Sequence, residues 1–128
     1  MSTRWHNQAL IKGCAQYALC TTQAEFDALL VKLKQPPEKF LAGNEQALSC
    51  TYEKPGRSKR PCVVVCVDAS KKQSLEKYYS TLIHESVHVW QEFREYIGED
   101  KPSTEFEAYS IERIAYNLMM EFKKRMPL

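Results

Sequence analysis

Hydrophobic residues recur along the chain with two different spacings, one typical of strands and one typical of helices. The mostly apolar run at 14–20 predicts a short strand. Thr22 and Glu25 then match a capping box, which predicts a helix that ends near Lys34, just before two consecutive prolines. The apolar positions of this segment recur at helical spacing: Phe26, Leu29, Leu30 and Leu33.

Two more strands are predicted at 47–53 and at 62–67. The segment between them, 54–61, is rich in turn-forming and basic residues, so we expect a β-hairpin with a solvated tip. The second strand is apolar on both faces. It should therefore be covered on both sides, on one of them by a helix.

Two long helices are predicted in the second half of the chain. Ser74 can cap a helix that runs to about Ile97, where Gly98 suits the left-handed residue after a helix end. A last helix should begin near Thr104 and continue to about Lys124. The expected fold class is α+β, with a small antiparallel or mixed sheet packed on the first of these helices and the C-terminal helix beside it.

Composition limits the classes of protein that fit. A chain of 128 residues suits a single domain, residues 1–128, and 44% hydrophobic content is enough for a core. The formal net charge of +2 does not favour nucleic-acid binding, which needs a concentrated basic surface. There is no apolar run long enough for a membrane span and no secretory signal, so we expect a cytoplasmic protein without a membrane partner.

The strongest chemical signal is the HExxH pattern at His84, Glu85 and His88. Average residue frequencies give a chance match in a chain of this length roughly 1 time in 200. Histidines four residues apart differ by about 40° around a helix and can bind one metal ion together. Around the predicted helix they lie on the polar side, away from the apolar stripe. In zinc hydrolases with this pattern the glutamate is the general base that takes a proton from the activated water.

A catalytic zinc site needs a third protein ligand, and the next predicted helix offers three glutamates. Glu107 falls within the apolar stripe of that helix, whereas Glu105 and Glu112 fall outside it. A carboxylate on an inward face is costly unless it is paired or metal-bound, which favours Glu107 as the ligand. The alternative is a capping box formed by Thr104 and Glu107.

These residues resemble a known family. HExxH followed by a glutamate on the next helix is similar to the gluzincin type of zinc metallopeptidase, and the segments 84–91 and 98–109 resemble small zincin-like proteins of bacteriophages and prophages. The step from Glu107 to Ala108 also resembles the third-ligand segment of small phage-repressor-cleaving peptidases. The resemblance implies a minimal zincin-like domain in the cytoplasm of a bacterial host, with zinc bound by His84, His88 and Glu107.

The predicted function is therefore a zinc metallopeptidase, a hydrolase of peptide or protein substrates with Glu85 as its general base. The strand at 62–67 could align an extended peptide if it lies at the sheet edge. No oxyanion-stabilising residue can be assigned from these candidates: His6, Arg94, Tyr96, Tyr109 and Tyr116.

Two other classes stay open. One is a phage accessory or binding protein whose zinc site is structural or catalytically idle, and the other is a nucleic-acid-binding protein, which the near-balanced charge disfavours.

Five cysteines without an export signal indicate reduced thiols. Cys62 and Cys66 should share one strand face near Cys50, as core residues rather than as metal ligands.

Overall fold

The computed structural model describes residues 5–6, 16–41, 45–53 and 60–126. Its strands and helices are, in chain order, β1 (Trp5–His6), β2 (Gln16–Cys20), α1 (Gln23–Lys32), β3 (Ala47–Glu53), β4 (Pro61–Val67), α2 (Leu75–Ile97) and α3 (Thr104–Arg125). The predicted α+β class is confirmed, and every predicted strand and helix is present within about three residues of its expected bounds.

The four strands form one mixed sheet in the order β1-β2-β4-β3. The expected hairpin is confirmed, because β3 and β4 pair antiparallel, while β2 and β4 pair in parallel. β4 therefore lies between two partners and has no free edge. The suggestion that this strand aligns a peptide at the sheet edge is wrong, because β3 occupies the edge instead.

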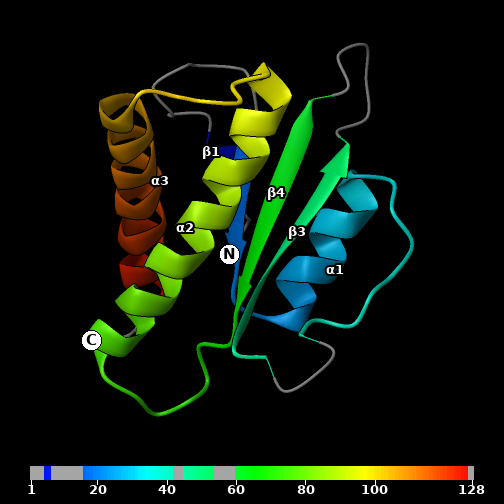
Figure 1. The fold of residues 1–128 in the computed structure, drawn as a ribbon. Coiled ribbons are helices and arrows are strands. Elements are labelled where there is room, and N and C mark those ends of the chain that lie inside the picture. Colours follow the sequence, from blue (N-terminus) through cyan, green and yellow to red (C-terminus); the bar gives the residue numbers. More distant parts are fainter. Residues whose placement is uncertain (1–4, 7–15, 42–44, 54–59, 127–128) are drawn as a thin grey trace.

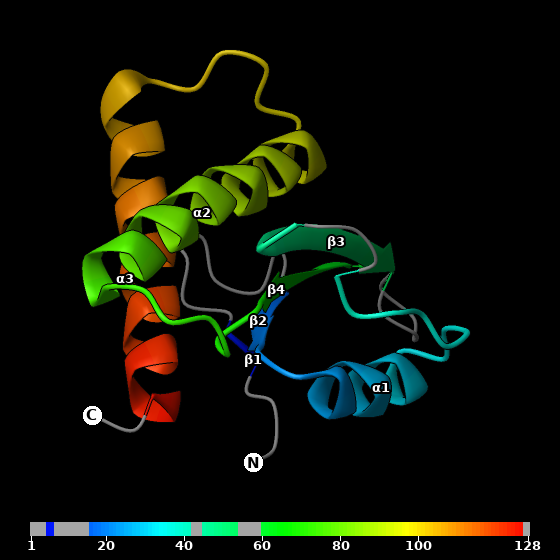
Figure 2. The ribbon, with the colours of Figure 1, turned by 90° about the horizontal axis from the view of Figure 1, so that it is seen from below.

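Helices cover both faces of the sheet (Figures 1 and 2), with α1 on one face and α2 and α3 on the other. The sequence of β4 explains why both faces are covered, because its alternate side chains point into two hydrophobic clusters, one on each face of the sheet. Val63 and Val65 pack with α2 and α3, whereas Val64 and Cys66 pack with α1. Coverage of β4 on both faces was expected from its continuous apolar run, and it is confirmed.

Local signals in the sequence explain where the helices begin and end. The Thr22 hydroxyl accepts from the Glu25 amide, the Ser74 hydroxyl accepts from the Lys77 amide, and Gly98 ends α2 with a φ of 74°. At α3 the cap is Ser103, whose hydroxyl accepts from the Phe106 amide. The capping-box alternative for Glu107 is therefore wrong, because Thr104 is already inside the helix.

Helix α2 carries the HExxH residues, and its buried apolar residues pack in one core cluster with residues of the sheet and of α3. Its buried apolar residues are Tyr78, Leu82, Val89, Trp90 and Phe93. Neither α2 nor any other helix in the described ranges is both long enough and apolar enough to cross a membrane.

Candidate metal centre

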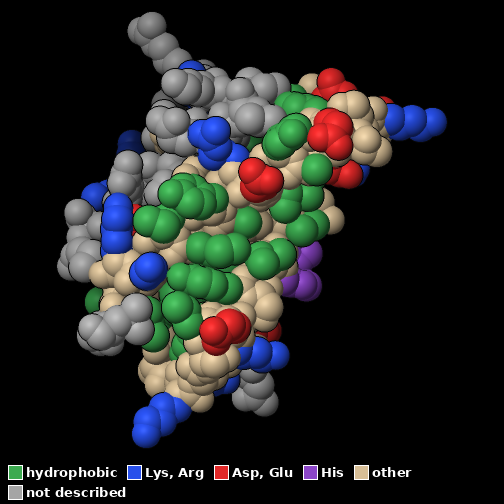
Figure 3. Space-filling model, turned by 90° about the vertical axis from the view of Figure 1, so that its left-hand side faces the viewer, with side chains coloured by type: hydrophobic (Ala, Val, Ile, Leu, Met, Phe, Trp, Pro, Cys, Tyr) green, Lys and Arg blue, Asp and Glu red, His purple; other side chains and the backbone are tan. Residues whose placement is uncertain are grey.

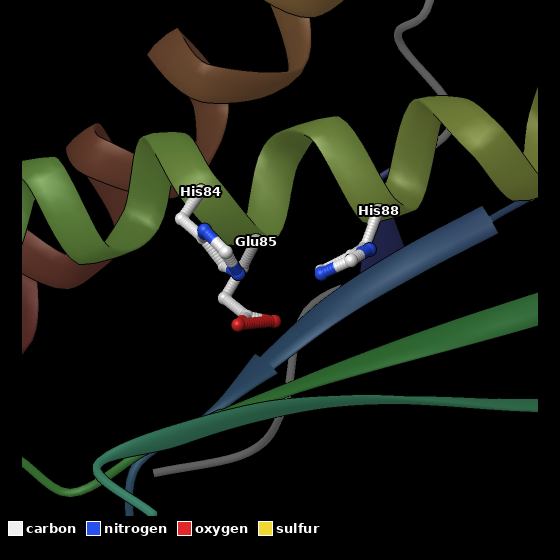
Figure 4. A group of neighbouring side chains, drawn as sticks. All are labelled: His84, Glu85 and His88. Atoms are coloured by element: carbon white, nitrogen blue, oxygen red, sulfur yellow. The ribbon is translucent and has the colours of Figure 1, made fainter.

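His84, Glu85 and His88 form one group on α2. Each offers a ligand atom, an imidazole nitrogen or a carboxylate oxygen, and these atoms all lie within 4.8 Å of one another. Figure 4 shows the three side chains leaving α2 on the same side and pointing toward the strands. The two imidazole rings lie 4.9 Å apart between centroids and are nearly perpendicular, at 78°. The helical spacing predicted this convergence of the two histidines.

The two histidines are exposed, whereas the glutamate between them is buried. Figure 3 shows histidine side chains at the surface beside a band of hydrophobic side chains. His88 Nδ1 lies 3.0 Å from Gln91 Oε1, so Nδ1 donates to the amide oxygen. In that tautomer Nε2 keeps its lone pair, which is the arrangement that metal-binding histidines commonly have.

Glu85 is only 5% exposed and depends on a neighbour from another element. The Ser49 hydroxyl, on edge strand β3, donates to Glu85 Oε2 at 2.6 Å. In the part of the chain that the structure describes, no lysine or arginine forms an ion pair with this carboxylate. A buried carboxylate with so little compensation weakens a fold, so this arrangement is typical of a residue retained for chemistry.

Ser49 is the residue that sequence analysis missed. A serine in a strand gives no functional signal by itself, and its approach to Glu85 depends on which strand α2 lies against. Only the strand order, with β3 at the edge, brings the two side chains together.

Glu107 lies elsewhere in the structure. Its Oε2 accepts a hydrogen bond from Trp90 Nε1 at 2.9 Å, which joins α3 to α2. The group of ligand atoms within 4.8 Å does not include it. The expected inward position is present, since Glu107 is half-buried, but its role as third ligand stays a prediction.

The structure does not identify an oxyanion-stabilising residue among the candidates. Tyr96, Tyr109 and Tyr116 are 47%, 55% and 60% exposed, and Arg94 is half-buried near the end of α2. The side chain of His6 lies outside the described part of the structure. No oxyanion partner is therefore assigned.

A groove of about 320 Å³ lies further along α2. Glu92, one helical turn after His88, lines it together with residues from the ends of β3 and β4. The complete lining is Thr51, Tyr52, Glu53, Pro61, Glu92, Glu95 and Tyr96. The groove has aromatic and acidic walls, and its lining does not include His84, Glu85 or His88.

The donor set fits zinc. Neutral imidazole nitrogens and a carboxylate are ordinary zinc ligands, and exposed histidines leave open positions for water and substrate. The hydrogen bond from His88 to Gln91 supplies the outer support that such ligands usually have.

Searches of protein families, of curated proteins and of solved structures found no match to this chain. The functional argument therefore depends on the site itself.

Proposed function

We propose that this protein is a zinc-dependent peptidase that cleaves a peptide bound beside β3. The observation that carries the proposal is the clustering of His84, Glu85 and His88, with the buried Glu85 held by Ser49. Two exposed histidines alone would suit a structural metal. A carboxylate placed between them and fixed from a second element is what general-base catalysis requires.

The proposed roles follow from the positions of the side chains. His84 and His88 bind zinc through their imidazole nitrogens, and zinc supplies the Lewis acidity that activates water and polarises a peptide carbonyl. Glu85 takes the proton from the attacking water and passes it to the leaving amine. Ser49 keeps the Glu85 carboxylate in one orientation.

Glu107 is the proposed third ligand. A carboxylate has two oxygens, and the Trp90 indole occupies Oε2 in the structure. Glu107 lies outside the group of ligand atoms formed by His84, Glu85 and His88, so metal binding by this side chain would require it to move toward the histidines.

The edge strand provides a place for the substrate. The outer edge of β3 faces no other described strand, so its backbone groups can pair with an extended peptide. Such a peptide would pass the HExxH residues and reach the groove beside Glu92.

Metal analysis tests whether His84 and His88 bind zinc. We expect close to one equivalent of zinc in the wild type after supply of excess metal, and its loss in the His84→Ala/His88→Ala variant. Less than about half an equivalent in both proteins would contradict the proposal.

The Glu85→Gln variant tests whether Glu85 is the general base. It should keep its zinc and lose peptide hydrolysis by a factor of about 10² to 10⁴, because the amide cannot accept the proton. Glu76→Gln, an exposed change on the same helix, is the matched control. Zinc binding without hydrolysis of a broad peptide library by the wild type would instead support a structural or idle metal site.

A further inference from the structure

The groove beside Glu92 carries negative charge from two elements. Glu92 and Glu95 belong to α2, and Glu53 is the last residue of β3. Glu92 is half-buried, and the other two are exposed. Within the described ranges, no lysine or arginine forms an ion pair with any of these carboxylates. A hollow lined by charges of one sign attracts a ligand of the opposite sign, so the groove favours a cation from outside the chain.

The shape and lining of the groove suit a long cationic side chain rather than a metal ion. None of the three glutamates belongs to the group of described residues that could hold a metal. The groove also has apolar surface, from Pro61 and from Tyr96, which is 47% exposed. Arginine and lysine lay their stems on such surface, and a guanidinium stacks on an aromatic ring.

The edge strand connects the metal centre with this groove. Alternate side chains of β3 share one face, and Ser49 of that face contacts Glu85 whereas Thr51 and Glu53 line the groove. β3 and α2 run in a similar direction (Figure 1). From Ser49 to Glu53 the strand advances about 13 Å. From Glu85 to Glu92 the helix advances about 10 Å. An extended peptide covers this distance in about three to four residues.

We propose that the groove binds an arginine or lysine side chain of the substrate, about three to four residues from the peptide bond that is cleaved. The inference rests on the proposed function, because that function places the substrate along β3. Pairing of backbone groups with an edge strand is open to any sequence, so selectivity depends on the places that receive side chains. The groove supplies the charge that distinguishes a basic peptide from a neutral one.

Peptide binding can be measured separately from cleavage. The probes are two fluorescent ten-residue peptides of alanine and serine that differ at one central position, arginine in one and glutamine in the other. Zinc-loaded Glu85→Gln protein is used, so that the peptides stay intact, and fluorescence anisotropy gives the affinities. We expect the arginine peptide to bind at least about tenfold more tightly, with a preference that weakens as salt is added. Equal affinities would overturn the proposal.

Variants of the groove test whether its carboxylates cause the preference. In the same protein, the added Glu92→Gln/Glu95→Gln pair should bring the two affinities within about threefold of each other, while zinc content and binding of the glutamine peptide stay unchanged. Glu76→Gln, an exposed change on the same helix, should keep the full preference. A preference that survives in the variant of the groove would contradict this role of Glu92 and Glu95.

Cleavage by the wild type tests the register. Mass spectrometry of the products should place the cut about three to four residues from the arginine. Equal cleavage of both peptides would overturn this inference and leave the peptidase proposal standing. Tight binding of the arginine peptide without any cleavage by the wild type would contradict the peptidase proposal and support the groove as a site for basic side chains.

Discussion

Glu85 is a buried carboxylate held by one hydroxyl from a different part of the chain. A hydrogen bond to a charged group is stronger than one between neutral groups, and losing it leaves the charge uncompensated. Ser49 should therefore affect both the stability of the protein and the position of its proposed general base.

For Ser49→Ala we expect the free energy of unfolding to fall by about 1 to 3 kcal/mol. Zinc content should not change, while kcat falls more than KM rises, because the base is less well oriented. Denaturant unfolding, metal analysis and steady-state kinetics measure these three quantities. Thr104→Ala, an exposed change at the start of α3, is the control, and equal effects of the two variants would contradict a specific role for Ser49.

Glu107 accepts a hydrogen bond from Trp90 and is also the proposed third zinc ligand. One substitution can distinguish the contribution to helix packing from the contribution to zinc binding. Glu107→Gln keeps an oxygen to accept from Trp90, so stability should change by less than about 1 kcal/mol, whereas zinc affinity should fall at least about tenfold. Competition with a chelator gives the affinity. Glu105→Gln, exposed on the same helix, should change neither quantity. Unaltered zinc affinity in Glu107→Gln would restrict this residue to helix packing.

The histidine pair could be predicted from sequence because both residues lie on one helix, where spacing alone determines which side chains meet. The hydrogen bonds of Glu85 and Glu107 could not be predicted from the sequence. The first joins β3 to α2 and the second joins α2 to α3, so both depend on the packing of elements, which no local sequence pattern indicates.

At the scale of the elements, the three helices and the strands β2, β3 and β4 were predictable because caps and apolar patterns are local signals, whereas β1 was not predicted. The strand order was not. β2 and β4 pair in parallel although α1 and β3 lie between them in sequence, and this pairing is what moves β3 to the edge. The apolar run of β4 predicted its burial but did not identify its neighbours.

Gly98 illustrates how one residue ends an element. Its φ of 74° is left-handed, and a Cβ added there would meet no atom within 4 Å, so the cost of substitution is conformational. Gly98→Ala should lower the free energy of unfolding by about 1 to 2 kcal/mol, and Gly98→Asn by less. Denaturant unfolding of both variants measures this order, and a stable alanine variant would contradict it.

At the scale of the whole molecule, a buried ion pair connects the two helical layers. Arg125, at the end of α3, lies 2.7 Å from Glu25 of α1 and also donates to the Leu19 carbonyl of β2. Glu121 lies 3.3 Å from the same guanidinium. One side chain thus joins a helix on each face to a strand between them.

Arg125→Met should cost about 3 to 5 kcal/mol of stability, because Glu25 is left buried without its partner. Adding Glu25→Gln should recover part of that loss, since the uncompensated charge disappears. A double-mutant cycle by denaturant unfolding measures the coupling, with Lys124→Met as an exposed control on the same helix. Simple additivity of the two changes would show that the pair contributes no coupling.

The central place of β4 also has a kinetic consequence. Its pairing with β3 joins strands that are close in sequence, whereas its pairing with β2 must first close a much longer loop. We therefore expect the β3–β4 pair to be structured in the folding transition state and α2 to dock on it afterwards. Ser49 would then be in place before Glu85 arrives, so that losing their contact speeds unfolding without slowing folding. The contact between Ser49 and Glu85 would then form after the β3–β4 pair, late in folding.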